Sequence, residues 1–487
     1  MVTQTVQQYL QNQLNRAPVL LRRYTEDKQG KQFIKRQAYH ELRELVGSFL
    51  DGNTQVRMVA IPGLRGVGKT TILAQLYTEL YPQFQERILF ISVDQIINLL
   101  NADLYTVLEE YQHILGVSFE KLDSPIVLFI DEVHFDPKWQ AVLKAVFDRS
   151  KQVFVFCTGS SALSLQSTPD LARRILFKTL YPLDFSEYIQ LKSSYTEDAL
   201  SPVSSAHNGS KFNGDLQQQL RTALFDSDTV VDAHSSLQNL QQATQKRLLS
   251  IEEFDVAQYL QYGSMPFTLG VQSELSYSLM NELIDRVIQK DLATVHSLSQ
   301  ETLQKIKHIL LMLAASDTVS LTSMAKNLTD IAMNTLIDVF EALEQAEMLL
   351  RIYPYGSATK KMRKPSKFTF MSPAIRYTLL STVDGARAFE QYKGKYLEDI
   401  VGLTLHKIFK EQVYYDSAKG GADFIVQSGK KKIVIEVGFG KKGINQVEET
   451  MKKIDARYGL LISEQPMQLF QEKNILSVPL KQFLFLK

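Results

Sequence analysis

The stretch Ala60–Thr71, AIPGLRGVGKTT, places several glycines directly before a lysine and two threonines. The residues before it, RMVAI (Arg57–Ile61), are apolar and β-prone. Those after it, ILAQLYTELY (Ile72–Tyr81), repeat apolar side chains at helical spacing. The glycines therefore lie where a predicted strand turns into a predicted helix. In that context the spacing Gly63-x-x-x-x-Gly68-Lys-Thr fits the phosphate-binding P-loop pattern.

Each residue type in this loop suits the binding of a triphosphate. Glycines allow main-chain N–H groups to turn inward around phosphate oxygens without side-chain clashes. A lysine can neutralise β- and γ-phosphate charge, a threonine hydroxyl can ligate Mg²⁺, and the positive end of the helix dipole faces the same anion. The alternative is a chance glycine-rich turn, which the flanking strand and helix disfavour. The expected nucleotide-binding residues are Gly63, Gly66, Gly68, Lys69, Thr70 and Thr71.

A second acidic motif supports the first. IVLFIDEVH (Ile126–His134) reads as a buried strand that ends in two carboxylates. We expect Asp131 to hold Mg²⁺ opposite Thr70, and Glu132 to orient and deprotonate the attacking water. The alternative is an acidic pair that merely begins a solvated loop. Because no guanine-reading Asn-Lys-x-Asp or Thr-Lys-x-Asp motif is present, ATP is favoured over GTP.

Two further groups of residues could contact the γ-phosphate. The strand QVFVFCTGSS ends in Thr158, Ser160 and Ser161. One of them could sense the phosphate, with Ser160 as the chosen candidate, or all could simply cap the following turn. Arg173 or Arg174 could stabilise transition-state charge at a neighbour's γ-phosphate. The alternative for both is an ordinary exposed arginine pair.

The order P-loop, FIDEV, CTGSSA and RR…YPLDFSEYI resembles prokaryotic AAA+ ATPases of the archaeal-ATPase type. YLQYGSMPF (Tyr259–Phe267) is similar to the Gly-x-x-Pro element of that family, and RVIQKDL (Arg286–Leu292) to its helix ending in Lys/Arg-Asp. The resemblance implies an α/β fold: a P-loop NTPase core of AAA+ type with a parallel sheet, followed by a helical lid, a winged helix and a small restriction-endonuclease-like α/β domain. It also implies that Arg174 is the family's arginine, and that sites are completed between subunits of a homo-oligomer.

The region after the lid suggests the winged helix. SLTSMAKNL, the helix NTLIDVFEALEQAE, and the strand pair MLLRIYP and KFTFM fit its order of elements. The loop TKKMRKPSK would form a basic wing able to make nonspecific DNA contacts. The helix expected to enter the major groove carries four carboxylates and no basic residue, so sequence-specific recognition is not expected, and packing as a lid is the alternative. The five basic residues of the wing are Lys360, Lys361, Arg363, Lys364 and Lys367.

The C-terminal segments GKYLEDIVGLTL, GGADFIV and KIVIEVGFGKK resemble the PD-(D/E)xK nuclease core. Asp423 and Glu436, on neighbouring strands, could converge on Mg²⁺ with Glu398 from the preceding helix. Gly438 stands where the family places a lysine, which puts cleavage in doubt. A decayed, structural version of the fold is the alternative. The lysines that could supply the missing cation are Lys432, Lys441 and Lys442.

Composition sets the outer limits. The chain has 487 residues, too many for one core, and 54 basic against 53 acidic residues, so overall charge favours no particular partner. The single cysteine, Cys157, excludes an internal disulfide, and no apolar stretch is long enough for a membrane span. The N-terminus has no signal-peptide pattern, so we expect a cytoplasmic protein without a membrane partner.

The expected division has five segments. They are an N-terminal helical segment (1–53), a P-loop ATPase core (54–190), a helical lid with a Ser/Gln-rich insertion (191–316), a winged helix (317–383) and a PD-(D/E)xK-like domain (384–487). The function expected from this arrangement is an ATP-binding and ATP-hydrolysing switch. The alternatives are an ATP-dependent DNA nuclease of defence or mobile-element biology, and a DNA-binding regulator that does not hydrolyse ATP.

Overall fold

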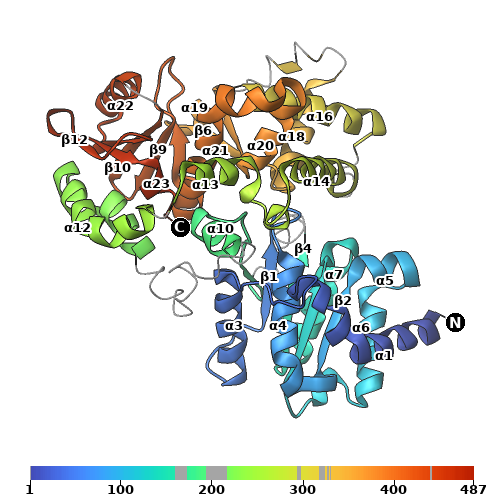
Figure 1. Cartoon of the computed structure of the whole chain (residues 1–487). Coiled ribbons are helices and arrows are strands. Elements are labelled where there is room, and N and C mark those ends of the chain that lie inside the picture. The colour runs from blue at the N-terminus through green and yellow to red at the C-terminus, as the bar shows by residue number, and fades with distance from the viewer. Residues whose placement is uncertain are drawn as a thin grey trace. The chain divides into compact units, whose positions relative to one another are not determined.

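The chain forms two compact units, Met1–Tyr181 and Pro182–Lys487 (Figure 1). No helix among the described residues combines the length and the apolar character needed to cross a membrane. The computed structural model describes residues 2–159, 173–193, 216–249, 251–292, 298–316, 324–325, 328, 331–438 and 441–486.

The first unit is built on a five-stranded sheet whose strands are all parallel, in the order β2-β3-β4-β1-β5. Three of its strands are the apolar runs predicted before the P-loop, before the acidic pair and in QVFVFCTGSS, and the predicted parallel sheet is confirmed. The last strand is shortened to two residues. The strands are β1 Met58–Pro62, β2 Ile88–Ser92, β3 Ile126–Asp131, β4 Val153–Gly159 and β5 Leu176–Phe177.

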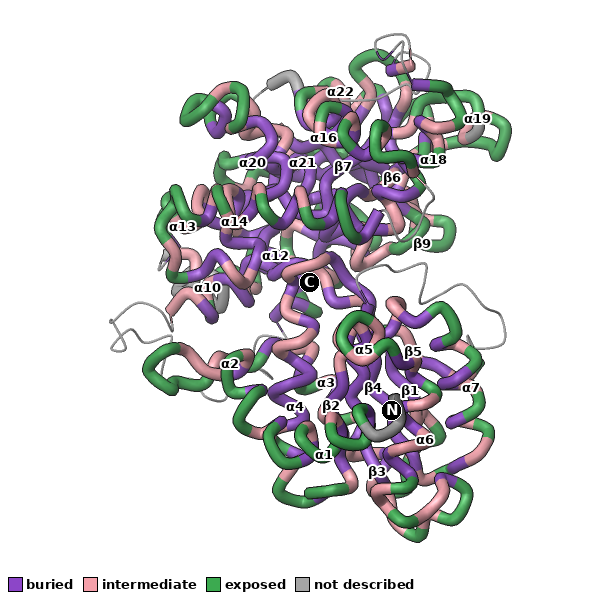
Figure 2. The backbone as a smooth tube through the Cα atoms, turned by 90° about the vertical axis from the view of Figure 1, so that its right-hand side faces the viewer, coloured by how far each residue is buried: buried purple, intermediate pink, exposed green. Residues whose placement is uncertain are grey.

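Helices cover both faces of this sheet. Side chains alternate between the faces along each strand, and the central strands are buried along their whole length, so both faces are apolar and need cover. Aliphatic side chains on one face pack against α1, α5, α6 and α7. On the other face the Phe129 ring stacks 5.3 Å from Phe156, and Tyr77 of α4 lies 5.9 Å from Phe129. Figure 2 shows the strands buried between the two helix layers. The helices are α1 Val2–Leu20, α2 Arg22–Thr25, α3 Gln37–Leu50, α4 Lys69–Phe84, α5 Val93–Leu100, α6 Leu104–Leu115 and α7 Trp139–Arg149, with 3₁₀ turns at Gln85–Arg87, Phe119–Lys121 and Val133–Phe135.

The second unit contains an eight-stranded mixed sheet in the order β12-β13-β11-β10-β9-β8-β6-β7. The predicted strand pair before the C-terminal region is present as the antiparallel hairpin β6–β7. Strand β6 also pairs in parallel with β8, through Tyr353 and Tyr414, so the hairpin and the C-terminal strands share one sheet. The strands are β6 Leu349–Pro354, β7 Lys367–Phe370, β8 Val413–Tyr415, β9 Phe424–Ser428, β10 Lys431–Val437, β11 Tyr458–Ser463, β12 Gln468–Phe470 and β13 Ile475–Pro479.

Helices α20 and α21 run against each other in this unit and are held by a buried ion pair. Arg376 of α20 donates to both carboxylate oxygens of Asp399 on α21, at 2.7 and 2.8 Å. The helices are α10 Phe185–Lys192, α12 Val230–Leu249, α13 Glu253–Gln258, α14 Ser273–Arg286, α16 Gln300–Ala315, α18 Met333–Gln345, α19 Ala358–Arg363, α20 Pro373–Asp384, α21 Ala388–Phe409, α22 Lys441–Ile454 and α23 Leu480–Phe483. Shorter π and 3₁₀ turns lie at Thr222–Asp226, Tyr259–Gly263, Pro266–Thr268, Val287–Leu292, Gly385–Arg387, Lys410–Gln412 and Gln471–Lys473.

The Ser/Gln-rich insertion of the predicted lid contains the 20-residue helix α12. Just before α12, the chain packs on the C-terminal strands: the Tyr458 hydroxyl donates to the carbonyl of Leu224 at 2.6 Å, and Lys431 donates to the carbonyl of Asp226 at 2.8 Å. The insertion thus contributes to the structure around the C-terminal sheet. The finer boundaries within 191–487 stay predictions.

Candidate active site

The P-loop joins β1 to α4 at the carboxyl edge of the parallel sheet, where ligands of such sheets usually bind. Gly66 and Gly68 have φ of +84° and +98°, in the left-handed region that favours glycine. Gly63 is required for a different reason: a Cβ atom there would lie 2.4 Å from the carbonyl oxygen of Leu180. No side chain caps the start of α4, so the N–H groups of its first turn face the loop.

The ammonium group of Lys69 is buried and is held by the loop itself. Its Nζ donates to the carbonyl oxygens of Gly63 at 2.6 Å and Leu64 at 3.1 Å. Both acceptors are neutral, whereas a phosphate oxygen carries charge and makes a stronger bond with an ammonium. The lysine can therefore exchange these carbonyls for a bound triphosphate. Thr71, the third residue of α4, is partly buried one position beyond Thr70.

Asp131 ends β3 and faces the P-loop threonine, as the sequence predicted. Its carboxylate accepts a hydrogen bond from the Thr70 hydroxyl at 2.8 Å and another from the Thr158 hydroxyl of β4. Burial, and then the charge of Glu132, raise the pKa of Asp131 to about 6, against the lowering effect of the hydroxyls and of Lys69. A hydroxyl and a carboxylate are the hard oxygen ligands that Mg²⁺ prefers, so this pair fits that ion.

Glu132 follows in an unusual backbone conformation for a residue with a side chain. Its φ is +53°, and its N–H donates to the Thr158 hydroxyl at 3.0 Å. Its carboxylate lies 3.4 Å from Nδ1 of His134, whose side chain is only 4% exposed. Local strain of this kind is found at functional sites. Sequence reasoning did not single out His134, although it lies two residues after Glu132 in the same motif.

The other residues predicted to contact the γ-phosphate are Thr158, Ser160, Ser161, Arg173 and Arg174. Thr158, one of three alternatives on its strand, makes the contacts with the acidic pair, while Ser160 lies outside the described residues. Arg174 donates to Asp148 at 3.0 and 3.3 Å. Because Arg174 precedes β5, which runs parallel to β1, it lies at the amino edge of the sheet, opposite the P-loop. Its role as a catalytic arginine stays a prediction.

Sequence reasoning missed Arg36, which contacts the P-loop from the segment before α3. Its buried guanidinium donates to the carbonyl of Val67 at 2.7 Å and to that of Tyr181 at 3.0 Å. The chain next to Tyr181 also lies along β1, since the N–H of Leu180 donates to the carbonyl of Pro62 at 2.8 Å. Arg36 therefore joins the loop to the last residues of the first unit. No motif or spacing in the sequence marks this arginine.

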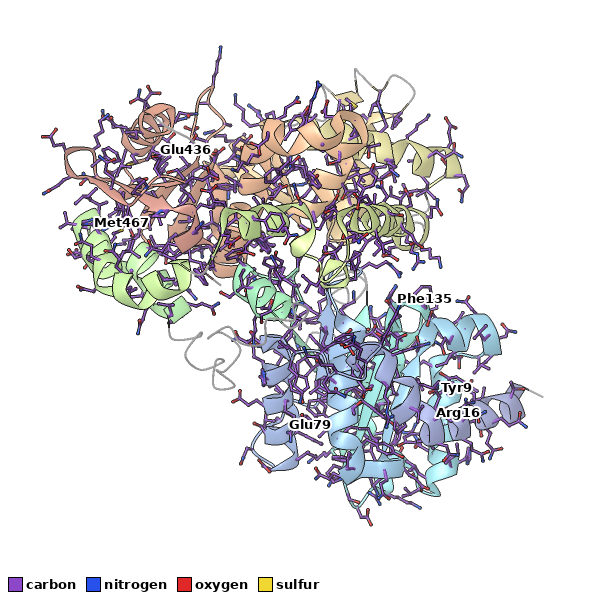
Figure 3. The ribbon with its side chains drawn as sticks, in the orientation of Figure 1. Tyr9, Arg16, Glu79, Phe135, Glu436 and Met467 are labelled. Carbon is purple, nitrogen blue, oxygen red and sulfur yellow. The ribbon has the colours of Figure 1, made fainter. Side chains whose placement is uncertain are left out.

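In the second unit, the three predicted acids do come together. Glu398 lies on α21, Asp423 directly precedes β9, and Glu436 lies on β10 and is labelled in Figure 3. The N–H of Asp423 donates to Glu436 Oε2 at 3.0 Å. The Nζ of Lys367 lies 2.6 Å from Glu398 and 2.8 Å from Asp423. We call these four residues the carboxylate–lysine cluster.

The position of Lys367 corrects two expectations. It was predicted in the exposed basic wing, but it begins β7 and is buried, because the three acids provide a polar environment for its ammonium. It also supplies a cation that the sequence expected from elsewhere: Lys432 instead donates to the carbonyl of Ile454. The side chains of 441 and 442 lie outside the described residues, so their part stays a prediction.

Burial dominates the electrostatics of the cluster. Burial, and then the charge of Asp423, raise the pKa of Glu436 to about 9. Burial lowers the pKa of Lys367, but the charges of Asp423 and Glu398 outweigh it and raise that pKa above its usual value, so the lysine is charged. Within the described part of the chain, no group of three or more His, Cys, Asp or Glu side chains is arranged to hold a metal ion. Because the ammonium of Lys367 already pairs with Glu398 and Asp423, the cluster in this form does not fit the metal that the nuclease resemblance implied.

A protein-family model matches most of the sheet-containing part of the first unit. A family model described as "AAA domain" matches residues 55–189, which include the P-loop and the acidic pair. The predicted α/β fold with a P-loop core of AAA+ type is thereby confirmed. A model described as "Domain of unknown function (DUF8612)" matches residues 253–385. The winged helix and the nuclease-like domain stay predictions.

Two solved structures align over much of the chain but with low scores. The Aeropyrum pernix ORC1 protein in complex with DNA is 11% identical, covers 71% of this chain and 91% of its own, and has a TM-score of 0.31. The Thermotoga maritima RuvB Holliday junction branch migration motor is 17% identical, covers 68% and 93%, and has a TM-score of 0.28.

Two archaeal proteins are similar over most of their length. Uncharacterized protein MJ1544 of Methanocaldococcus jannaschii is 22% identical over 409 residues, 81% of this chain and 77% of its own. Uncharacterized protein MJ1637 of the same organism is 34% identical over 485 residues, 98% of this chain and 93% of its own. The chain therefore belongs to the same protein family as MJ1637.

Proposed function

We propose that this protein is a cytoplasmic AAA+ type molecular switch that binds and hydrolyses ATP with Mg²⁺. The observation that carries the proposal is the contact of 2.8 Å between the Thr70 hydroxyl and the Asp131 carboxylate, next to the buried ammonium of Lys69. A loop of main-chain N–H groups, a cation and two hard oxygen ligands are what a magnesium-bound triphosphate requires.

Each residue of the site has a separate role in the proposed hydrolysis. Lys69 leaves the loop carbonyls and binds phosphate oxygens, which neutralises charge that grows in the transition state. Thr70 and Asp131 would hold Mg²⁺, whose chemistry, when bound, is to neutralise phosphate charge. Glu132 accepts a proton from the attacking water, and Thr158 fixes the acidic pair through its hydroxyl.

The place of Arg174 supports the proposal that the protein assembles into a homo-oligomer. This arginine lies at the edge of the sheet opposite the P-loop of its own chain. If it stabilises the transition state, it therefore acts on ATP bound to a neighbouring copy. Its exposed pairing with Asp148 leaves the guanidinium at the surface, where a neighbour can reach it.

A nonspecific DNA contact is proposed for the remaining basic residues of the predicted wing, which lie on and next to α19. Their ammonium and guanidinium groups can bind phosphates without reading sequence, and such binding weakens as salt rises. The alternative function, an ATP-dependent nuclease, has less support because Lys367 fills the carboxylate cluster.

The test is ATP binding and turnover by two variants. Lys69→Ala should abolish ATP binding, while Glu132→Gln should bind ATP and lose about 10²–10⁴-fold in hydrolysis rate, the usual contribution of a general base. Lys178→Ala and Glu120→Gln are matched controls, because both residues form surface ion pairs away from the loop. Hydrolysis by Glu132→Gln at the rate of Glu120→Gln would reject the assignment of Glu132.

A further inference from the structure

We propose that Lys367 is a built-in cation that takes the place of a metal ion in the carboxylate–lysine cluster, and that the cluster fastens the β6–β7 hairpin to the C-terminal sheet instead of cleaving nucleic acid. The inference is independent of the ATP site, because it concerns the second unit alone.

The geometry of the ammonium supports this role. Lys367 Nζ lies at hydrogen-bond distance from both Glu398 and Asp423, at 2.6 and 2.8 Å. The ring of Phe424 lies beneath it, 4.7 Å from the ammonium to the ring centroid. The lysine side chain is only 5% exposed, so little of its ammonium is accessible to a DNA phosphate in this arrangement.

The carboxylates are also oriented by the chain itself. Asp423 accepts a hydrogen bond from the N–H of Val437 at 3.0 Å, and Glu436 accepts one from the N–H of Asp423 at 3.0 Å. Main-chain donors and the lysine together supply the hydrogen bonds that buried carboxylates require. A divalent ion bound to the same oxygens would lie close to the ammonium, and their repulsion would oppose its binding.

The lysine comes from outside the segment to which the nuclease resemblance applied. It begins β7, within the residues that match the domain of unknown function, whereas its partners lie on α21 and β9. The next acid of α21 repeats the arrangement, because Asp399 accepts from Arg376 at 2.7 Å and from the N–H of Phe370 at 2.8 Å. Two consecutive acids of one helix are thus each neutralised by a cation from residues 367–376. This double contact adds to the pairing of β6 with β8, which already places the hairpin and the C-terminal strands in one sheet.

The test measures binding of Mn²⁺ alone, without nucleotide, in full-length protein. All variants carry Asp131→Asn, so that the first unit lacks the carboxylate proposed to hold Mg²⁺; metal that the first unit still binds is separated by its independence of Asp423. Protein with Lys367 intact should bind no Mn²⁺ that depends on Asp423. Lys367→Met should bind one Mn²⁺ at least about tenfold more tightly than protein with Lys367 intact, because the repelling ammonium charge is gone. Adding Asp423→Asn should remove that site. Lys361→Met, which removes a lysine from α19, should behave like the parent.

Two outcomes would overturn the proposal. If protein with Lys367 intact binds Mn²⁺, and Asp423→Asn abolishes this binding, the cluster is a metal site. If folded Lys367→Met binds Mn²⁺ no better than Lys361→Met, the lysine does not stand in for a metal. The comparison of Asp423→Asn with its parent needs no change at Lys367, so it remains decisive if Lys367→Met fails to fold. Mg²⁺-dependent plasmid cleavage that disappears in Asp423→Asn would reject the proposal as well.

Discussion

Replacing Arg36 with methionine should weaken ATP binding although this side chain is expected to make no contact with ATP. The guanidinium is buried and bridges the carbonyl oxygens of Val67, in the P-loop, and Tyr181, at the end of the first unit. Methionine keeps much of the volume but donates no hydrogen bond. The loop carbonyl then loses the donor that fixes it, and the loop samples arrangements in which its N–H groups no longer converge.

The size of the effect follows from the two hydrogen bonds. A hydrogen bond to a charged group contributes about 1.5–3 kcal/mol, and a buried carbonyl left without a donor adds a desolvation cost. The carbonyl of the partly exposed Tyr181 can recover water, so its loss is the smaller one. We expect the free energy of unfolding of the first unit to fall by about 2–4 kcal/mol. In the variant, ATP binding must supply the free energy that the Val67 hydrogen bond otherwise provides to order the loop. The Kd for ATP should therefore rise about tenfold to a hundredfold.

The assay is the Kd of ATP–Mg²⁺ measured in a Glu132→Gln background, where the nucleotide stays intact. In the parent background, KM should rise while kcat at saturating ATP changes little, because bound ATP itself orders the loop. Arg43→Met is the matched control: this arginine lies on the following helix, is 38% exposed, and pairs with Glu79 at 2.6 Å. Exposed pairs contribute about 0–1 kcal/mol. Equal Kd values for Arg36→Met and Arg43→Met would refute the reasoning.

Two further predictions concern the second unit. Arg376→Met should lower the free energy of unfolding of this unit by about 3–5 kcal/mol, because Asp399 is left buried without its cation. The double variant Arg376→Met with Asp399→Leu should recover most of this loss. Hydrogen exchange in α20 and α21 measures both variants, and a double variant no more stable than the single one would contradict the account. Burial, and then the charge of Lys410, lower the pKa of His406, so the folded protein binds this proton less tightly than the unfolded chain. The contribution of neutral His406 to stability is complete above the unfolded pKa of about 6.5 and is lost as the pH falls below it. The unfolding midpoint of His406→Gln should therefore fall less steeply between about pH 7 and pH 5 than that of the parent protein. Parallel curves of unfolding midpoint against pH for the two proteins would exclude this group.

The parts of the first unit that the sequence predicted depend on local patterns. The strands are short apolar runs, and the spacing from Gly63 to Thr70 is specific because each position has its own steric or chemical requirement. Asp131 could be placed opposite Thr70 because parallel strands end at the same edge of the sheet. Arg36 escaped notice because its partners are main-chain carbonyls, and a carbonyl has no signature in the sequence.

The error at Lys367 has a related cause. Its neighbours in the sequence are basic, and a run of basic residues usually lies in solvent, so the loop was interpreted as a wing. Burial of a lysine is decided by partners elsewhere in the chain, and Asp423 lies 56 residues away. The acids themselves were predicted to converge, but nothing in their spacing indicated that the cation would come from a different segment.

Two buried lysines of the described residues, Lys69 and Lys367, show how the same side chain can serve opposite purposes. The ammonium of Lys69 is held by the neutral carbonyls of Gly63 and Leu64, so a triphosphate that replaces them brings charge that the lysine lacked. The ammonium of Lys367 already has two carboxylates as partners, Glu398 and Asp423, and a phosphate entering there would meet their negative charge. A lysine held by neutral groups is ready for an anionic ligand, whereas a lysine held by carboxylates has one already in its own chain. The partners of the ammonium therefore distinguish the site that we propose to bind phosphate from the contact that we propose to hold the fold together.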